Sequence, residues 1–292
     1  MSDQITTAFV QEYKDTLELL VQQKQSRLRQ AVTVKSFKGK SAKAIEQIGA
    51  VTATKLTTRH GDTPQINTPH SARWINPSDY VIADMIDEQD KLRMLVDPES
   101  SYSQNFVAAM NRAIDDELIG AATGTAYVGE NGTTTEAFDT TNWDIAHGGT
   151  GLDLAKLRTA KRKLMAAEND PDEEYFLVCK AKQIDDLLGT TQVTSSDYNT
   201  VKALVAGQID TFMGFKFVHS ERILNDGTSD WVLAFPRSAL CLGIWKDSVT
   251  EIERLPTRNY STQVYNRMTI GATRTHEAGS TAKGKLVKIL CN

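Results

Sequence analysis

Apolar residues recur at helical spacing in three stretches of the chain, and each stretch predicts a helix. The N-terminal stretch has its apolar positions at Phe9, Tyr13, Leu17, Leu20 and Leu28. The longest helix is predicted at about residues 101–122, with an apolar stripe at Phe106, Val107, Met110, Ala113, Ile114 and Leu118. Asp153 is a good N-cap for a third helix through Ala167, with inward positions at Leu154, Leu157, Leu164 and Met165.

The second half of the chain changes to the shorter apolar runs that are typical of strands. Strands are predicted in "EEYFLVCK", "FMGFKFVHS", "DWVLAFP", "ALCLGIW", "VTEIERL", "QVYNRMTIGATRTHEA" and "KLVKILC". Short helices are predicted at "AKQIDDLLG" and at residues 199–206. Most of the late strands are expected to be antiparallel, which makes the fold class α+β.

One predicted strand contains Gly214, between Phe212 and Phe215. Glycine weakens a strand interior, so the position suggests a β-bulge or a close approach of another backbone. The apolar residues around it are interpreted as core.

Residues 49–73 are rich in threonine and β-branched residues around the turn signal "HGDTP". They predict a long hairpin that is too polar to form a core. An isolated hairpin is marginal in water, so this one is expected to rest on another chain. Residues 129–150, rich in Gly, Thr and Asn, are interpreted as a linker at a domain boundary.

Residues 24–43 carry seven basic side chains and no acidic one. Two interpretations stay open, a solvated flexible arm and an arm that faces a polyanion or an acidic neighbour. The net charge of the whole chain is −4, so bulk electrostatics do not favour nucleic-acid binding.

Composition excludes several classes of protein. No apolar run approaches the roughly 20 residues that span a bilayer, and the N-terminus lacks a secretory pattern, so we expect a cytosolic protein with no membrane partner. The three cysteines have no metal-ligand spacing. Cys179 and Cys241 are expected to be buried, whereas Cys291 could be exposed near the C-terminus.

Motifs of catalysis are missing from the sequence. No glycine-rich loop follows a strand and opens a helix, no G-x-S-x-G is present, and the five histidines are scattered. The adjacent pair Asp115 and Asp116 point about 100° apart on a helix, so solvated or salt-bridged acids are the preferred interpretation. We therefore predict no enzyme, with no catalytic, cofactor-binding or metal-binding residues and no cofactor.

Four segments resemble the major capsid proteins of tailed bacteriophages, of the Hong Kong 97 type fold, and most of all the coat proteins of short-tailed phages. The helical segment 80–129 contains the family's R-x-x-D-x-x-[LI] pattern at Arg112, Asp115 and Leu118. The other three are "MGFKFVHSERI", "VLAFPRSALCLGIWKDSVTEI" and "NRMTIGATRTHEAGSTAKGKLVKILCN". Together the four segments cover most of the chain from Asn76 onward. Their order and spacing, more than any one of them, carry the resemblance.

The resemblance implies a division of the chain into parts. It implies an N-terminal arm at 1–45, an extended β-hairpin loop at 46–75, a peripheral domain at 76–149 with a long spine helix at about 101–122, an axial domain at 150–245, and return strands to the peripheral domain at 246–292. The chain would cross between domains in the 129–150 linker and at a turn near Gly243.

The implied function is self-assembly into an icosahedral shell of hexamers and pentamers that encloses packaged double-stranded DNA without sequence-specific binding. Such a protein is assembled in the host cytoplasm and ends in the virion. A separate scaffolding protein is an expected partner, because the chain begins almost directly with its arm, and a portal is expected as well. A Lys–Asn crosslink, known in some relatives, is not carried over to Lys55 and Asn259 or Asn266.

Contacts between subunits are predicted in the loop and in the arm. The loop residues are Lys55, Arg59 and Asp62, and the arm residues are Lys35, Lys38 and Lys40. Three alternatives remain at this stage: an encapsulin-like nanocompartment shell, an α+β enzyme, and a ring-forming tail or head-completion protein. Electron microscopy of the expressed protein with its genomic neighbours would separate them.

Overall fold

A computed structural model describes residues 22–49, 51–55, 57, 63, 65–86, 99–189, 211–258, 260–275 and 284–292. The chain forms two compact units. The first comprises Met1–Gln25, Asp79–Arg112 and Lys246–Thr269, and the second comprises Ser26–Ser78, Ala113–Trp245 and Ile270–Asn292. Several predicted features, including the N-terminal helix before residue 22 and the short helix at 199–206, lie outside the described residues.

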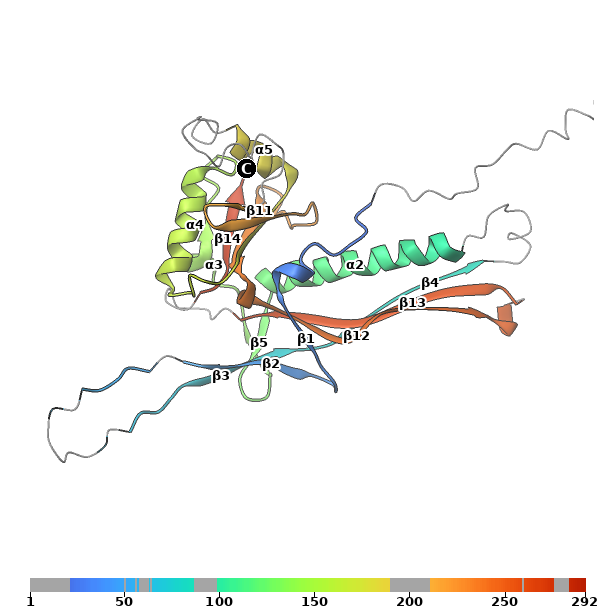
Figure 1. Ribbon diagram of the computed structural model, residues 1–292, viewed down its shortest axis with the longest axis horizontal. Helices are drawn as coiled ribbons and strands as arrows, with labels where there is room; N and C mark the ends of the chain where they lie inside the picture. The colour runs from blue at the N-terminus through green and yellow to red at the C-terminus, as the bar shows by residue number, and fades with distance from the viewer. Residues whose placement is uncertain are drawn as a thin grey trace, which may run out of the picture. The chain divides into compact units, whose positions relative to one another are not determined.

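The first unit is built from one half of a long helix and the ends of three strands (Figure 1). These elements are β4 (Ser78–Ile86), α2 (Glu99–Thr123), β12 (Leu240–Arg254) and β13 (Thr262–Arg274). Its core contains Ile86, Phe106 and Val264, with Ile82 and Tyr102 packed against them. Alternate residues of β4 and β13 therefore bury one face of the sheet under the helix.

The predicted long helix is present as α2, but its buried face differs from the predicted stripe. Met110, Ile114 and Leu118 are buried as expected, whereas Val107 is exposed. Asp115, interpreted as solvated or salt-bridged, is completely buried.

Strand β12 is one continuous strand, although the sequence predicts two strands at 239–245 and 249–255. The polar residues between them, which suggested an interruption, continue the strand in extended form. Gly243 therefore lies inside a strand, not in the predicted turn. A Cβ atom at this position would come within 2.9 Å of the Phe37 ring. The position therefore requires glycine, which has no side chain.

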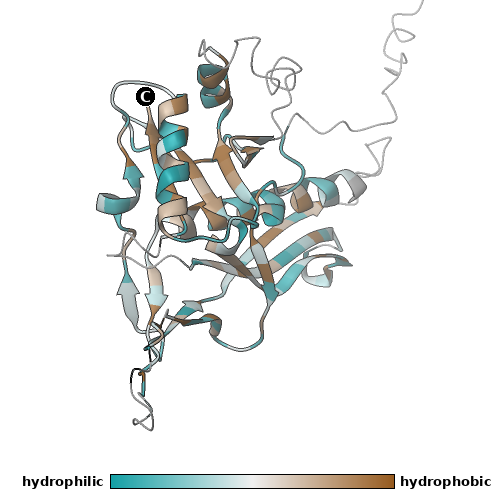
Figure 2. Cartoon of the chain, turned by 60° about the vertical axis from the view of Figure 1, so that its left-hand side comes forward, coloured by the Kyte–Doolittle hydropathy of each residue, from teal (hydrophilic) through white to brown (hydrophobic). Residues whose placement is uncertain are grey.

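The second unit contains a six-stranded sheet with the order β7-β14-β11-β8-β10-β9, which Figure 2 shows as mainly hydrophobic. The strands are β7 (Asp144–Ile145), β8 (Tyr175–Cys179), β9 (Thr211–Phe212), β10 (Phe215–His219), β11 (Asp230–Pro236) and β14 (Val287–Cys291). β11 pairs antiparallel with β8 and β14, as expected, but β10–β8 and β14–β7 are parallel.

Further helices of the second unit alternate with these strands along the chain. They are α3 (Thr140–Trp143), α4 (Leu154–Ala166) and α5 (Ala181–Leu188), with short 3-10 turns elsewhere at Arg29–Ala31, Arg237–Ala239 and Pro256–Arg258. Asp153 caps α4 as predicted, its side chain accepting from the Lys156 amide at 2.7 Å. Leu157 and Leu164 are buried, but Met165 is 62% exposed, contrary to the prediction. The presumed linker 129–150 is itself folded, because it contains α3, β7 and β6 (Thr134–Glu136).

Gly214 lies in a tight turn, so the predicted bulge is wrong. β9 and β10 pair antiparallel, with Phe212 opposite Phe215. The two residues between them have positive φ, 52° at Met213 and 79° at Gly214. Two consecutive left-handed residues define the type I′ hairpin turn, which favours glycine.

Replacing Gly214 with valine is expected to destabilise the protein by roughly 1–2 kcal/mol, because a β-branched residue is strained in the left-handed region. Urea unfolding measures the change. Gly214→Asn is the matched control, since asparagine tolerates positive φ, and it should unfold near the wild-type midpoint. An unchanged midpoint for the valine variant would contradict the turn assignment.

A third sheet has the order β2-β3-β5-β6 and contains the predicted hairpin. Its strands are β2 (Ala42–Ile48), β3 (His70–Ile75), β5 (Ala126–Val128) and β6. The hairpin strands were predicted within 49–73, but β2 lies entirely before that range, and no strand occurs in the described part of 49–69. The threonine-rich composition of residues 49–69 predicted strands, but its described residues pair with no neighbouring strand.

All three cysteines are buried, so the expectation that Cys291 could be exposed is wrong. Cys291 ends β14, which pairs with β11 inside the six-stranded sheet. Burial raises the pKa of Cys179 to about 12 and that of Cys291 to about 11. Thiolates are the reactive form, so these side chains are inert packing groups.

Candidate assembly surfaces

The base of the hairpin β2–β3 is fixed by a buried charge cluster. Arg73 of β3 donates from both terminal nitrogens to Glu136 of β6, at 2.9 and 3.3 Å. Arg274 of β13 donates to the backbone oxygen of Glu136 at 2.6 Å and to that of Gly124. Arg73 is 1% exposed and Arg274 0% exposed, so both guanidinium groups are out of water.

The Glu136 carboxylate thus accepts hydrogen bonds from Arg73 alone, and it acts on Arg274 through its nearby charge. Burial lowers the pKa of Arg274 to about 10; the nearby Glu136 opposes this shift and Arg73 adds to it. Among the described residues, the Nε atoms of Arg73 and Arg274 have no hydrogen-bond partner. Glu136 is therefore the group on which this cluster, and with it the pairing of the hairpin base, depends.

Beyond this base, the described residues of the hairpin are not buried. Every described residue from 51 to 70 is exposed. The two ends of the segment nevertheless lie side by side, because the Gly49 amide donates to the Pro69 carbonyl at 2.8 Å. The hairpin is thus anchored at its base, and its described residues beyond the base are exposed.

The segment after residue 22 is held by hydrogen bonds from α2. In the second unit, Asp115 accepts from the Ser26 hydroxyl at 2.6 Å and from the backbone amides of Arg27 and Leu28, each at 3.1 Å. Leu28 is buried. The sequence interpretation of Asp115 as one of two equivalent acids missed this role.

The same segment is held within the first unit. Arg112 of α2 donates to the Gln22 side chain at 2.7 Å and to the Gln23 carbonyl at 3.1 Å. Asn111 donates to the Lys24 carbonyl at 2.9 Å. The Arg112–Asp115–Leu118 pattern noted in the sequence therefore combines two side chains that bind this segment with one that fills the core.

The rest of the predicted arm is folded as well, so the flexible-arm interpretation is wrong for its described part. β1 (Thr33–Ser36) pairs in parallel with β12 and joins a four-stranded sheet of order β1-β12-β13-β4. β2 then begins at Ala42. Only the turn between these strands projects from the sheets.

The residues predicted to form subunit contacts have different surroundings. Lys35, Lys38, Lys40 and Lys55 are all exposed, whereas Arg59 and Asp62 lie outside the described residues. The Lys35 ammonium donates to the Ala44 carbonyl at 2.9 Å, within its own chain. Lys38 and Lys40 are adjacent in one turn, and the structure does not bring Lys55 into their cluster.

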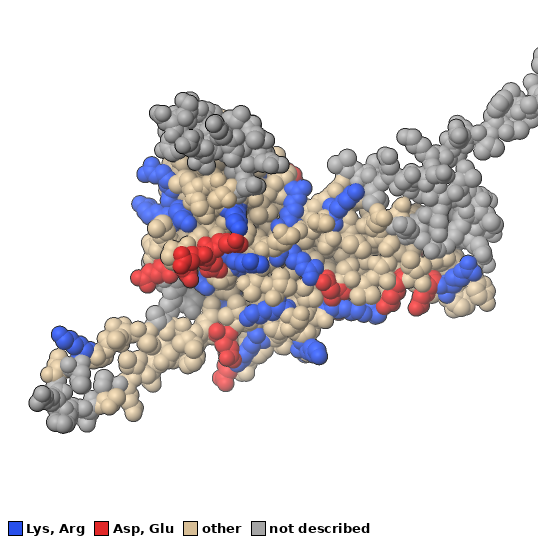
Figure 3. All heavy atoms as spheres, viewed as in Figure 1, with Lys and Arg blue, Asp and Glu red and all other residues tan. Residues whose placement is uncertain are grey.

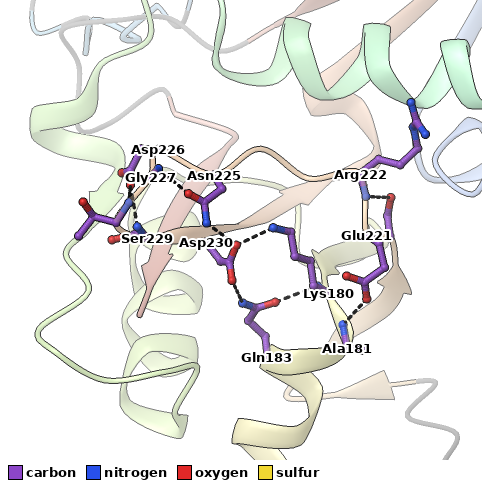
Figure 4. Close-up of polar contacts among 12 residues, drawn as sticks. Lys180, Ala181, Gln183, Glu221, Arg222, Asn225, Asp226, Gly227, Ser229 and Asp230 are labelled. Atoms are coloured by element: carbon purple, nitrogen blue, oxygen red, sulfur yellow. Dashed lines mark hydrogen bonds and ion pairs between the residues drawn. The ribbon is translucent and has the colours of Figure 1, made fainter.

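A polar network stabilises the loop between β10 and β11 (Figure 4). Asp230 accepts from Lys180 at 2.5 Å and from Asn225 at 2.8 Å, and hydrogen bonding from Lys180 is the main cause that lowers the pKa of Asp230. Arg222 of this loop forms an ion pair with Asp116. The predicted salt-bridge role is therefore confirmed for Asp116.

Across the described ranges, no three His, Cys, Asp or Glu side chains are grouped so that they could hold a metal ion. No helix in the described part of the chain is long and apolar enough to cross a membrane. The dominant features are anchored segments and exposed strands, which are the features of an assembling structural protein.

The fold is similar to those of solved phage capsid structures. The chain is similar to the capsid of the cyanophage P-SCSP1u, with TM-score 0.71, 17% identity, and coverage of 99% of this chain and 94% of that one. It is similar to the head structure of Helicobacter pylori bacteriophage KHP40, with TM-score 0.73, 12% identity, and coverage of 97% and 96%. A chain of Mycobacterium phage Che8 gives TM-score 0.68, 16% identity, and coverage of 96% and 97%. The predicted capsid fold is therefore confirmed.

The family follows from the sequence itself. The family model of the phage capsid protein matches residues 5–292, and the chain belongs to this family. No curated protein sequence matches the chain significantly. The chain is thus a structural protein of the phage particle that forms its shell, as the sequence resemblance predicted.

Proposed function

We propose that this protein assembles into a closed icosahedral shell of hexamers and pentamers that encloses the double-stranded DNA of a tailed phage. The single observation that carries the proposal is the unburied hairpin, whose described residues from 51 to 70 are all exposed although its base is firmly anchored. Such a segment gains burial only against another subunit.

The domain roles are part of the same proposal. Residues 1–45 act as the arm, 46–75 as the extended loop over the adjacent subunit, and 76–149 as the peripheral domain with α2 as its spine. Residues 150–245 act as the axial domain around five-fold and six-fold axes, and 246–292 return to the peripheral domain. β12 is one uninterrupted strand across the proposed boundary at residues 245 and 246, which supports a direct connection from the axial domain to the peripheral domain.

Assembly on this proposal makes and breaks no covalent bond. Stable association needs interfaces of roughly 1,000 Å² or more. Exposed ion pairs contribute only about 0–1 kcal/mol each, so loop contacts at Lys55, Arg59 and Asp62 and arm contacts at Lys35, Lys38 and Lys40 are individually weak. Weak contacts summed over many neighbours allow wrongly placed subunits to dissociate before the shell closes.

The partners follow from this role. A separate scaffolding protein directs assembly in the host cytoplasm, a portal occupies one vertex, and the shell holds DNA without reading its sequence. The net charge of −4 favours confinement by the shell over tight binding of DNA.

Shortening the hairpin tests the proposal directly. Replacing residues 50–68 with Asn-Gly joins two ends that are already hydrogen-bonded, and Asn-Gly suits a two-residue turn. The shortened subunit is expected to unfold within about 1 kcal/mol of the wild type, because it loses no buried residue among those described. In the presence of the scaffolding protein it should form no shells, as judged by electron microscopy and light scattering.

The control is the unmodified chain with the same scaffolding protein, which should form closed particles. Shells of normal yield from the shortened chain would show that the hairpin is not an assembly element. A wild-type chain that stays monomeric at high concentration would overturn the proposed function itself.

A further inference from the structure

A groove of about 550 Å³ lies within the second unit. It runs between β2, the loop after α4, and the residues that flank β12–β14. Its apolar side comprises Ile45, Ile48 and Ala167, and Ile48 is 69% exposed. One exposed isoleucine is ordinary on a protein surface, so the case for a partner rests on the charge of the groove.

The opposite side of the groove is acidic. The loop from Glu168 to Glu174 contributes Glu168, Asp170 and Glu173 to the lining, and Asp172 lies exposed beside them. Figure 3 shows acidic side chains gathered at this end of α4. Glu173 is engaged by the Ser238 amide and hydroxyl, but Glu168 and Asp172 make no ion pair within the described part of the chain. Lys285 is the one cation that lines the groove.

The turn between β1 and β2 presents the complementary charge. Its sequence is Phe-Lys-Gly-Lys-Ser, and Lys38 and Lys40 are exposed, with no hydrogen bond or ion pair inside the described ranges. The turn is rigid at its base, because Phe37 packs on Trp245 and the Trp245 indole donates to the Gly39 carbonyl at 2.8 Å. These contacts fix the backbone from which the Lys38 and Lys40 side chains extend.

We propose that the Lys38–Lys40 turn of one copy docks in the acidic groove of a second copy of this chain. The contact rests on the proposed function and names one of its interfaces. Within the described residues, no hydrogen bond joins the turn to the groove of the same chain, so both surfaces are available to neighbours. Because turn and groove are different surfaces, each copy can use both at once, and successive contacts of this kind form a ring where the rotation between copies closes.

Charge complementarity selects this occupant. The groove is too acidic for DNA, and its apolar edge favours a protein partner over a free cation. Opposite charges across an interface mainly set specificity and register, and like charges brought together are strongly unfavourable. A reversal of sign on one surface should therefore weaken assembly more than a neutral substitution.

Charge reversal and its rescue form the test. Lys38→Glu with Lys40→Glu, and separately Glu168→Lys with Asp170→Lys, should each raise the concentration needed for shell assembly about tenfold. That change corresponds to about 1.4 kcal/mol. All four substitutions together restore the charge pairing and should return the value to within about threefold of wild type. Lys182→Glu reverses an equally exposed lysine elsewhere on the unit and should have no effect.

Cross-linking gives an independent readout. Lys40→Cys with Asp170→Cys, treated with a short bis-maleimide after assembly, should give a ladder of linked subunits on a denaturing gel. The native thiols are buried and do not compete. Lys182→Cys with Asp170→Cys is the matched control and should give no ladder.

The outcomes are decisive in each direction. Reversal variants that assemble like wild type, or a fourfold variant that is not rescued, would overturn the contact while leaving the proposed function intact. If circular dichroism shows that a reversal variant does not fold, the cross-linking result decides alone, and no ladder overturns the contact. Failure of the unmodified chain to form shells would instead overturn the proposed function.

Discussion

Glu136→Gln is expected to destabilise the subunit by roughly 3–5 kcal/mol, the cost that follows when one partner of a buried ion pair is removed. The substitution preserves the shape of the side chain but leaves Arg73, at 1% exposure, without the anion to which it donates. It also removes the nearby negative charge that opposes the burial cost of Arg274, which is 0% exposed and keeps its bond to the Glu136 backbone oxygen. Urea or thermal unfolding of the unassembled subunit measures the loss.

The pH dependence follows from Arg274. Its pKa in the folded protein is about 10, below the ordinary value of 12.5. The group is therefore charged in both folded and unfolded states at neutral pH, and the cost of burying it is fully present there. That cost is relieved only as pH rises through about 10. The difference between variant and wild type should accordingly be the same at pH 7 and pH 8.

Glu130→Gln is the matched control, because this glutamate is exposed in the turn between β5 and β6, the strand that ends at Glu136. It should change stability by no more than about 0.5 kcal/mol. Equal effects of the two substitutions would contradict a special role for Glu136.

Asp115→Ala is expected to cost at least about 3 kcal/mol and to release the segment from Ser26 to Ala31. The carboxylate accepts three hydrogen bonds from this segment, and bonds to charged groups contribute about 1.5–3 kcal/mol each. Hydrogen exchange should show loss of protection at the Arg27 and Leu28 amides, which identifies the site of the damage. Asp115→Asn retains acceptor oxygen and should have an intermediate effect.

The neighbouring residue provides the control. Asp116→Ala removes an exposed ion pair with Arg222, for which at most about 1 kcal/mol is expected. A comparable loss from both alanine variants, or unchanged protection of the two amides in Asp115→Ala, would show that Asp115 does not hold the segment.

Elements with strong local signals were predictable from the sequence. Helix α4 has both a capping aspartate and a regular apolar stripe, and β8 is a continuous apolar run, so local pattern and tertiary structure agree. α2 extends Glu99–Thr123, only slightly beyond the predicted 101–122. The capsid fold itself came from the order of four segments, not from any single motif.

Features that depend on distant residues were not predictable. Asp115 and Asp116 are adjacent residues of the same type, so the sequence gives no reason to treat them differently. In the structure, Asp115 is a buried acceptor for residues 26–28, whereas Asp116 forms an exposed ion pair. Gly214 carries no sign of turn or bulge until the pairing of Phe212 with Phe215 is known. The acidic groove combines residues from widely separated parts of the chain, so no local pattern could reveal it.

The connections between the two compact units have a mechanical consequence. The chain passes between them at 25/26, 78/79, 112/113, 245/246 and 269/270, and the last four of these positions lie inside β4, α2, β12 and β13. Hinges are usually loop or element-terminal residues that absorb large backbone rotations. Here a helix and three strands are unbroken at the crossing, so a change of angle between the units has to bend the helix and twist the strands. The connection is therefore expected to resist bending and not to act as a flexible hinge. A subunit forced into a different curvature would store strain energy in these elements and would tend to return to its original form.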